Sequence, residues 1–173
     1  SIPHKLLLRE LQAINCSPSA IQWFCSFLTS RRQRVVTRDG PTPWKEVNRG
    51  VPQGSSLSPL LFNIVVRELP RHTSSSALQF ADDISLSESS TELDEMKQRL
   101  FGGFLETKQF CESVGLTINP AKTQFIVFKA ATRRLPEPVS INLDGSFIPA
   151  VPFAKLLGVT LDCHLSFANH IQD

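Results

Sequence analysis

The chain has 173 residues, of which 41% are hydrophobic and 20% charged, and its net charge is +2. This composition is typical of an ordinary folded protein and argues against a disordered or strongly basic one. No apolar run approaches the roughly 20 residues that a membrane-spanning helix needs. The four cysteines (Cys16, Cys25, Cys111 and Cys163) have neither metal-ligand spacing nor the density of a disulfide framework, which favours a reduced, intracellular setting. The N-terminus shows no signal-peptide layout and no initiator methionine, so methionine removal and origin from a longer chain both remain open.

The first half of the chain predicts three helices and a pair of strands. Residues 1–14 carry leucines on one side of a helix that has Pro3 in its first turn, and Ser17 and Pro18 open a second helix. Residues 32–38 and 44–48 predict two short strands around a Gly/Pro turn. A loop at 49–59 precedes a largely buried apolar helix at 59–69.

The second half begins with a hairpin at 78–86, "LQFADDISL", whose tight turn places Asp82 and Asp83 at its tip. We expect Phe80, Ile84 and Leu86 to pack beside the helix at 59–69. The longest helix follows, from Ser90 to Gly115, with a kink or close packing at its Gly102–Gly103 pair. A strand at 123–128, an Asp-Gly hairpin at 140–149 and a last strand at 155–162 complete an α+β fold, a small antiparallel sheet with helices packed on one face.

Four segments carry residues that could serve chemistry, and each has a plainer interpretation. Asp82 and Asp83 also fit an exposed acidic turn. Gln53, Gly54 and Ser55 fit a structural loop, although glycine admits a close ligand and glutamine both donates and accepts hydrogen bonds. Lys122 fits a solvated surface. The four arginines at 31–38 fit either a solvated strand or a surface that binds phosphates. The candidates in this last segment are Arg31, Arg32, Arg34 and Arg38.

Taken together, the motifs resemble the palm of a reverse transcriptase, in particular that of non-long-terminal-repeat (LINE-like) retrotransposons. They are "GVPQGSSLSPLLFNI", "LQFADDISL", "GLTINPAKTQFIVF" and "KLLGVTLD", in that order. The resemblance covers nearly the whole chain. It implies a palm at residues 1–165 and the start of the thumb or connection at 166–173, in a chain that lacks the fingers.

The resemblance also implies a role for each matched residue. Asp82 matches the carboxylate that binds catalytic Mg²⁺, with Mn²⁺ as an alternative, and Asp83 matches a second, less direct one. Gln53 and Gly54 match a loop along the incoming nucleotide and template, next to Ser55, Phe80 and Ala81. Lys122 matches a lysine that assists departure of pyrophosphate, and the arginines match a basic stretch near the template. Leu157 and Gly158 match the turn of the primer grip.

The implied reaction is RNA-directed DNA synthesis from dNTPs, on an RNA template and a DNA primer, in cytoplasm or nucleus and without a membrane partner. Two Mg²⁺ ions about 3.5–4 Å apart would serve such an in-line displacement, and carboxylates at a hairpin tip suit them as ligands. The family's other essential aspartate would lie upstream of Ser1, so we expect this chain alone to be inactive. The alternative is a degenerate or repurposed remnant that binds nucleic acid without catalysis; an unrelated α+β interaction domain is a third interpretation.

Overall fold

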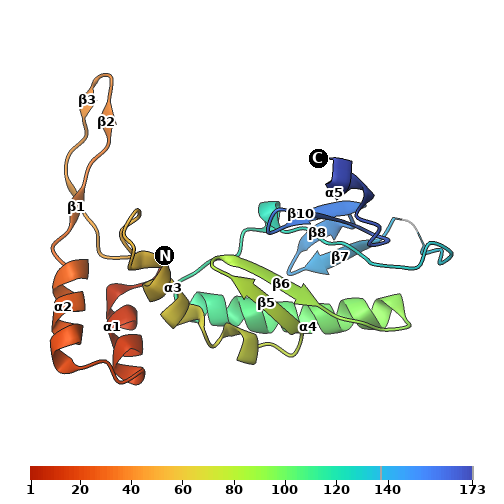
Figure 1. The fold of residues 1–173 in the computed structure, drawn as a ribbon, viewed down its shortest axis with the longest axis horizontal. Helices are drawn as coiled ribbons and strands as arrows, with labels where there is room; N and C mark the ends of the chain where they lie inside the picture. The colour runs from red at the N-terminus through yellow and green to blue at the C-terminus, as the bar shows by residue number, and fades with distance from the viewer. Residues whose placement is uncertain (137, 173) are drawn as a thin grey trace.

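A computed structural model describes residues 1–136 and 138–172. Its N-terminal part is helical (Figure 1). Helix α1 (His4–Ala13) contacts both α2 (Pro18–Leu28) and α3 (Ser58–Val66). The Ser17 hydroxyl accepts a hydrogen bond from the Ala20 amide at 3.3 Å and Pro18 takes the first helical position, as expected. Pro3 precedes α1 as its N-cap and is not in its first turn.

Residues 31–47 form an arm that extends away from the helices (Figure 1). Within it β1 (Arg32–Gln33) pairs with β4 (Lys45–Glu46), and β2 (Val36–Thr37) pairs with β3 (Gly40–Pro41), both antiparallel. The strand expected at 32–38 is thus divided into β1 and β2, and the one expected at 44–48 is shortened to β4. The short strand β3 lies within the expected Gly/Pro turn, and Pro43, which lacks the N–H that a continuous ladder would use, separates it from β4.

The first hydrophobic cluster joins α1, α2 and α3 to the C-terminal half of α4 (Leu93–Ser113). Helix α3 buries one face through Leu61, Val65 and Val66, whereas Leu60 on the same helix is exposed. Helix η1 (Leu69–Arg71) then leads into β5 (Ser76–Phe80) and β6 (Asp83–Ser87), an antiparallel hairpin that lies on α4 (Figure 1).

The second hydrophobic cluster lies on the N-terminal half of α4. Met96, Leu100, Phe101 and Phe104 pack there against residues that follow the helix, namely Phe125, Ile141, Leu143 and Ile148. One long helix thus serves both clusters. Close packing at its glycine pair is confirmed at Gly103, where an added Cβ would lie 2.6 Å from Ser75 Cβ, while Gly102 faces open space.

The C-terminal part consists of hairpins. After η2 (Pro120–Lys122), β7 (Ser140–Leu143) pairs with β8 (Ser146–Pro149), and β9 (Phe153–Leu156) pairs with β10 (Val159–Asp162), before α5 (Ala168–Gln172). The strand expected at 123–128 is wrong, because only Phe125 makes an isolated parallel bridge, to Ala150. The single strand expected at 155–162 is also wrong, because a turn at Leu157–Gly158 folds residues 153–162 into a hairpin.

The fold is α+β, as expected. The expected single sheet is not found: within residues 1–136 and 138–172 the strands form five separate two-stranded antiparallel ladders. Hairpin pairing is local and follows from turn chemistry, whereas a continuous sheet needs pairing between hairpins. No helix in the described part of the chain is long and apolar enough to cross a membrane.

Candidate active site

The acidic turn joins β5 to β6. Phe80 pairs with Asp83, which leaves Ala81 and Asp82 as a two-residue turn. Ala81 has a φ of 52°, a left-handed conformation that costs a residue with a Cβ about 1–2 kcal/mol. The Gln79 side-chain amide donates to the Ala81 carbonyl at 3.2 Å and supports this conformation. The turn therefore presents both carboxylates at one end of the hairpin, as the sequence predicts.

Both carboxylates are exposed, and none of the hydrogen bonds or ion pairs seen among the described residues involves either side chain. Two free carboxylates offer the hard oxygen ligands that Mg²⁺ and Mn²⁺ prefer, with room for water and phosphate in the remaining positions. The donor set therefore fits a divalent cation. No group of three or more His, Cys, Asp or Glu side chains suited to a metal ion occurs in the described residues.

The burial of the two faces of this hairpin is only partly as expected. Ile84 packs against the first hydrophobic cluster, as expected, and Leu86 is half-buried. Phe80 is 65% exposed and Leu78 on the same face is 72% exposed, so the expected burial of Phe80 is wrong. Alternate residues of a strand share a face, and here the face of Ala77 and Gln79 is the more buried one.

The base of the hairpin is fixed to α4. The Ser74 amide donates to Glu106 Oε2 at 2.5 Å, and Thr73 Oγ1 donates to the Gly103 carbonyl at 3.0 Å. The hydrogen bond from the Ser74 amide holds the pKa of the Glu106 carboxyl below its usual value. The charged Glu106 carboxylate thus holds the segment that precedes β5 against α4.

The loop that carries Gln53 and Gly54 is anchored at both ends. At its start the Gly50 amide donates to the Ile2 carbonyl at 2.7 Å, and His4 Nε2 lies 2.9 Å from the Gly50 carbonyl. At its end the Ser58 hydroxyl donates to the Pro52 carbonyl. Between these anchors Gln53 and Gly54 are exposed and Ser55 is half-buried, and Gly54 has a φ of 81°. Gln53 is thus presented to solvent by a fixed backbone.

Lys122 and the Leu157–Gly158 turn lie in other segments. Lys122 is exposed at the end of η2, a short helix that the Asn119 side chain caps at the Ala121 amide, at 3.0 Å. Leu157 and Gly158 form the β9–β10 turn, with φ values of 48° and 88°. The expected hairpin turn at this position is therefore confirmed, while the roles of these residues stay predictions.

Three of the candidate segments share one core. Val51, two residues before Gln53, packs against the first cluster with Ile84, two residues after Asp82, and with Ile118, four residues before Lys122. No hydrogen bond or ion pair among the described residues joins these segments to the Asp82–Asp83 turn itself. The Leu157–Gly158 turn belongs to the C-terminal hairpins, whose β7–β8 pair packs on the second cluster.

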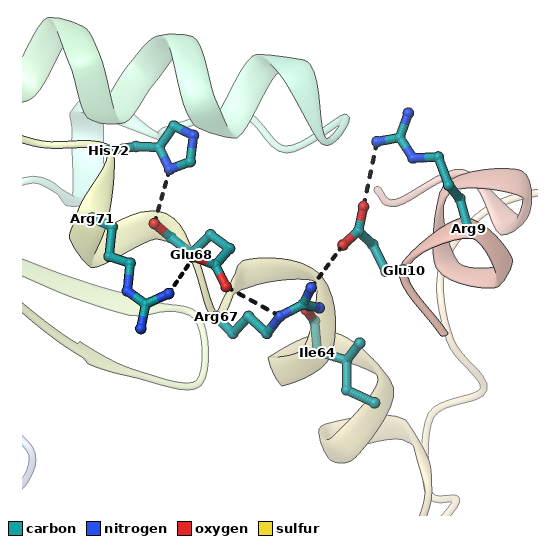
Figure 2. A network of polar contacts seen from close by, with 7 residues as sticks. All are labelled: Arg9, Glu10, Ile64, Arg67, Glu68, Arg71 and His72. Carbon is teal, nitrogen blue, oxygen red and sulfur yellow. Dashed lines mark hydrogen bonds and ion pairs between the residues drawn. The ribbon is translucent and has the colours of Figure 1, made fainter. Parts of the chain in front are cut away.

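Arg67 organises a polar network that joins α1 to α3 and η1 (Figure 2). Its guanidinium lies 3.3 Å from Glu10 on α1 and 3.3 Å from Glu68, and donates to the Ile64 carbonyl at 2.6 Å. His72 Nδ1 lies 2.9 Å from the Glu68 carbonyl. Because every member contacts another member or a nearby backbone, this network fixes the helices that carry the loop and the hairpin.

The arm places all four candidate arginines in solvent. Arg32 lies 4.0 Å from Glu46, Arg31 is 5.8 Å from the centre of the Phe27 ring, and Arg34 is 4.6 Å from the centre of the Trp44 ring. Sequence reasoning missed the aromatic partners. The four-residue spacing of Trp23 and Phe27 within α2 was the available signal for the stacked ring pair.

An α+β fold that presents paired free carboxylates on a hairpin turn is suited to metal-assisted chemistry on phosphates, the class that includes nucleic-acid polymerases. The family model described as reverse transcriptase (RNA-dependent DNA polymerase) matches residues 1–161. The chain therefore belongs to the reverse transcriptase family.

Similar proteins come from mobile elements. The chain is 32% identical to a probable RNA-directed DNA polymerase from transposon BS of Drosophila melanogaster, over 85% of this chain and 17% of that protein. It is 29% identical to the RNA-directed DNA polymerase from mobile element jockey of Drosophila funebris, over 97% of this chain and 19% of that protein. It is 28% identical to the retrovirus-related Pol polyprotein from type-1 retrotransposable element R2 of Popillia japonica, over 92% of this chain and 28% of that protein. The resemblance to non-LTR retrotransposon enzymes is confirmed, and the chain spans less than a third of each relative.

Proposed function

We propose that this chain is the palm part of an RNA-directed DNA polymerase of a non-LTR retrotransposon, with the palm at residues 1–165 and the start of the thumb at 166–173. Its substrates are dNTPs, a DNA primer and an RNA template. The observation that carries the proposal is the pair of free, exposed carboxylates that the Ala81–Asp82 turn presents at the end of the β5–β6 hairpin, in a chain of this family.

Asp82 and Asp83 would hold the divalent cation, Mg²⁺ or Mn²⁺. A cation held there would supply Lewis-acid stabilisation of the charge that develops on the attacking primer hydroxyl and on the leaving oxygen. Gln53 offers a donor and an acceptor toward nucleotide or template, beside Gly54 and Ser55. Phe80 and Ala81 present an exposed surface next to the acids. Lys122 supplies positive charge toward pyrophosphate, and the exposed Leu157 with Gly158 contacts the primer.

A third carboxylate, from a segment outside Ser1–Asp173, would complete the metal site. The family resemblance supports this proposal. The stretch of 173 residues would then bind nucleic acid but not extend a primer by itself. The competing function is a remnant that binds nucleic acid without catalysis, for which the four solvent-exposed arginines of the arm offer a basic surface.

The test is Asp82→Asn in a longer protein that contains this chain. Asn keeps the shape of the side chain but removes the charge that attracts the cation, so primer extension should be abolished while template binding persists. Asp83→Asn should reduce extension less. Mn²⁺ binding, followed by electron paramagnetic resonance, should weaken in both variants.

The matched control is Asp94→Asn, which removes one exposed carboxylate from the first turn of α4. It should leave both extension and Mn²⁺ binding unchanged. Primer extension by the Asp82→Asn protein at the rate of the unsubstituted protein would show that the metal assignment is wrong. Absence of extension in the unsubstituted longer protein, with template binding intact, would favour the remnant.

A further inference from the structure

Five side chains form a strip of rings and cations along α2 and the arm, which we name the Trp–Arg strip: Trp23, Phe27, Arg31, Arg34 and Trp44. Trp23 stacks on Phe27 with ring centres 5.4 Å apart and planes at 9°. The Arg31 guanidinium lies 5.8 Å from the centre of the Phe27 ring, and the Arg34 guanidinium lies 4.6 Å from the centre of the Trp44 ring. The strip thus consists of the stacked Trp23–Phe27 pair with Arg31 beside it, followed along the arm by the Arg34–Trp44 pair.

Both tryptophans leave a large part of their surface open. Trp23 is 52% exposed and Trp44 is 57% exposed. Phe27 covers one face of the Trp23 ring, and Phe24 meets that ring in an edge-on contact with centres 5.2 Å apart. The exposed area of Trp23 therefore includes its second face. An indole face in water is a stacking surface without an occupant.

Charge around the strip favours a polyanion. Residues 31–49 contain six basic and two acidic side chains, although the whole chain carries a net charge of only +2. The one ion pair seen within the described arm, Arg32 with Glu46, is 4.0 Å long and exposed on both sides. Such a pair contributes little and leaves the field of the arm positive.

We propose that the Trp–Arg strip binds unpaired RNA, with bases stacked on Trp23 and Trp44 and phosphates held by the arginines. The proposal rests on the function proposed above, which supplies an RNA template as the ligand, and adds two residues and a binding mode to it. Unpaired RNA is the favoured occupant because only an unpaired base offers its face to a ring, while its backbone supplies the anions. A duplex offers the anions alone.

Intrinsic fluorescence gives a direct measurement, because the chain has two tryptophans and no tyrosine. The variants Trp44→Phe and Trp23→Phe each leave one reporting indole, at Trp23 and Trp44 respectively. A short oligouridine should quench both single-tryptophan proteins on binding, since a stacked base contacts the indole. An oligomer of the same length without bases, and duplex RNA, should bind through charge with little quenching.

Affinity should separate stacking from charge. Trp23→Leu and Trp44→Leu keep an apolar side chain but remove the large ring, so each should weaken oligouridine binding about tenfold, with an unchanged slope of log affinity against log salt. Arg31→Ala with Arg34→Ala should flatten that slope by about 0.7 for each lost phosphate contact. The matched controls are Phe147→Leu, at a ring that is 74% exposed elsewhere, and Arg134→Ala with Lys155→Ala; both should behave as the parent chain.

Unchanged fluorescence of both single-tryptophan proteins at saturating oligouridine would overturn the proposal, and would point to a protein partner for the strip. Equal affinity for the oligomers with and without bases would also overturn it. Because the latter comparison uses the unsubstituted chain, it decides the question even if a leucine variant fails to fold. These measurements do not use primer extension. A result that contradicts the stacking proposal can therefore be told apart from one that contradicts the polymerase proposal.

Discussion

At the scale of single residues, the three aspartates Asp82, Asp83 and Asp162 show how surroundings decide what a carboxylate does. Asp162 ends β10 and accepts hydrogen bonds from the amides of His164, Ser166 and Phe167 at 2.8–3.2 Å, and from the Ser166 hydroxyl at 3.0 Å. Burial raises its pKa, but these bonds outweigh burial and lower it to about 2. Asp162 therefore orders the turn before α5, whereas the acids of the β5–β6 turn stay free for a ligand.

This lowered pKa predicts a specific pH dependence. The folded pKa of about 2 lies below the usual aspartate pKa of 3.8, so the stabilisation by Asp162 is complete above pH 3.8 and is lost as the pH falls toward 2. Asp162→Asn should therefore lower the melting temperature near pH 6 and have little effect near pH 2. Thermal melts across this range measure the difference, with Asp39→Asn as the control for loss of one charge.

Equal destabilisation by Asp162→Asn at both pH values would contradict the assignment of its hydrogen bonds to the charged carboxylate. Amide proton shifts of Ser166 and Phe167, followed across the same titration, would locate the change at the turn.

Residue patterns predict which side chains share a face, but not which face meets the core. The alternation around Leu78 and Phe80 correctly predicts a strand, and the two acids correctly predict a turn. The pattern predicts that the face of Leu78 and Phe80 meets the core, yet the structure buries the face of Ala77 and Gln79 more deeply. The close approach of Ser75 to Gly103, which no strand pattern contains, fixes how the hairpin meets α4.

At the scale of elements, α4 contains two adjacent glycines with opposite surroundings. Gly102 faces open space, while an added Cβ at Gly103 would collide with Ser75. Gly102→Ala should stabilise the chain by up to about 1 kcal/mol through helix propensity. Gly103→Ala should instead destabilise it by about 1–3 kcal/mol, because packing the extra methyl forces β5 away from the helix. Urea denaturation of the two variants measures both changes.

Each glycine variant serves as the control for the other, because both replace glycine by alanine in the middle of α4 and differ only in what surrounds the added methyl group. Stabilisation by Gly103→Ala would show that the hairpin does not pack on α4 as described. Ser75→Gly removes the colliding atoms and should restore part of the stability lost in Gly103→Ala.

Helices and hairpins were predictable as elements because their signals are local: Ser17 and Pro18 begin α2, and Asp144–Gly145 turns β7 into β8. Pairing between elements was not predictable. The segment at 123–128 has the composition of a strand but finds a partner only at Phe125, because a strand forms where another backbone is in reach. For the same reason the separate ladders do not join into the expected sheet.

At the scale of the whole molecule, the chain spans 17% of the length of its BS relative and 19% of that of its Drosophila funebris jockey relative. Purified alone, the 173 residues should show no primer extension with Mg²⁺ or Mn²⁺, because two carboxylates would not fix the cations as in-line displacement requires. A protein that includes the segment upstream of Ser1 in the gene should regain extension. Extension by the short chain that disappears in Asp82→Asn would show that the site is complete without that segment.

The position of α4 between the two hydrophobic clusters sets the mechanical behaviour of the molecule. Its last turns pack with α1, α2 and α3, and its first turns pack with the β7–β8 hairpin. The two clusters therefore cannot slide past each other; a change in their separation requires the helix to bend. Bending concentrates where the backbone is least restrained by side chains, at Gly102. The helix is thus a stiff spacer that bends most readily at Gly102, where no neighbouring side chain restrains it.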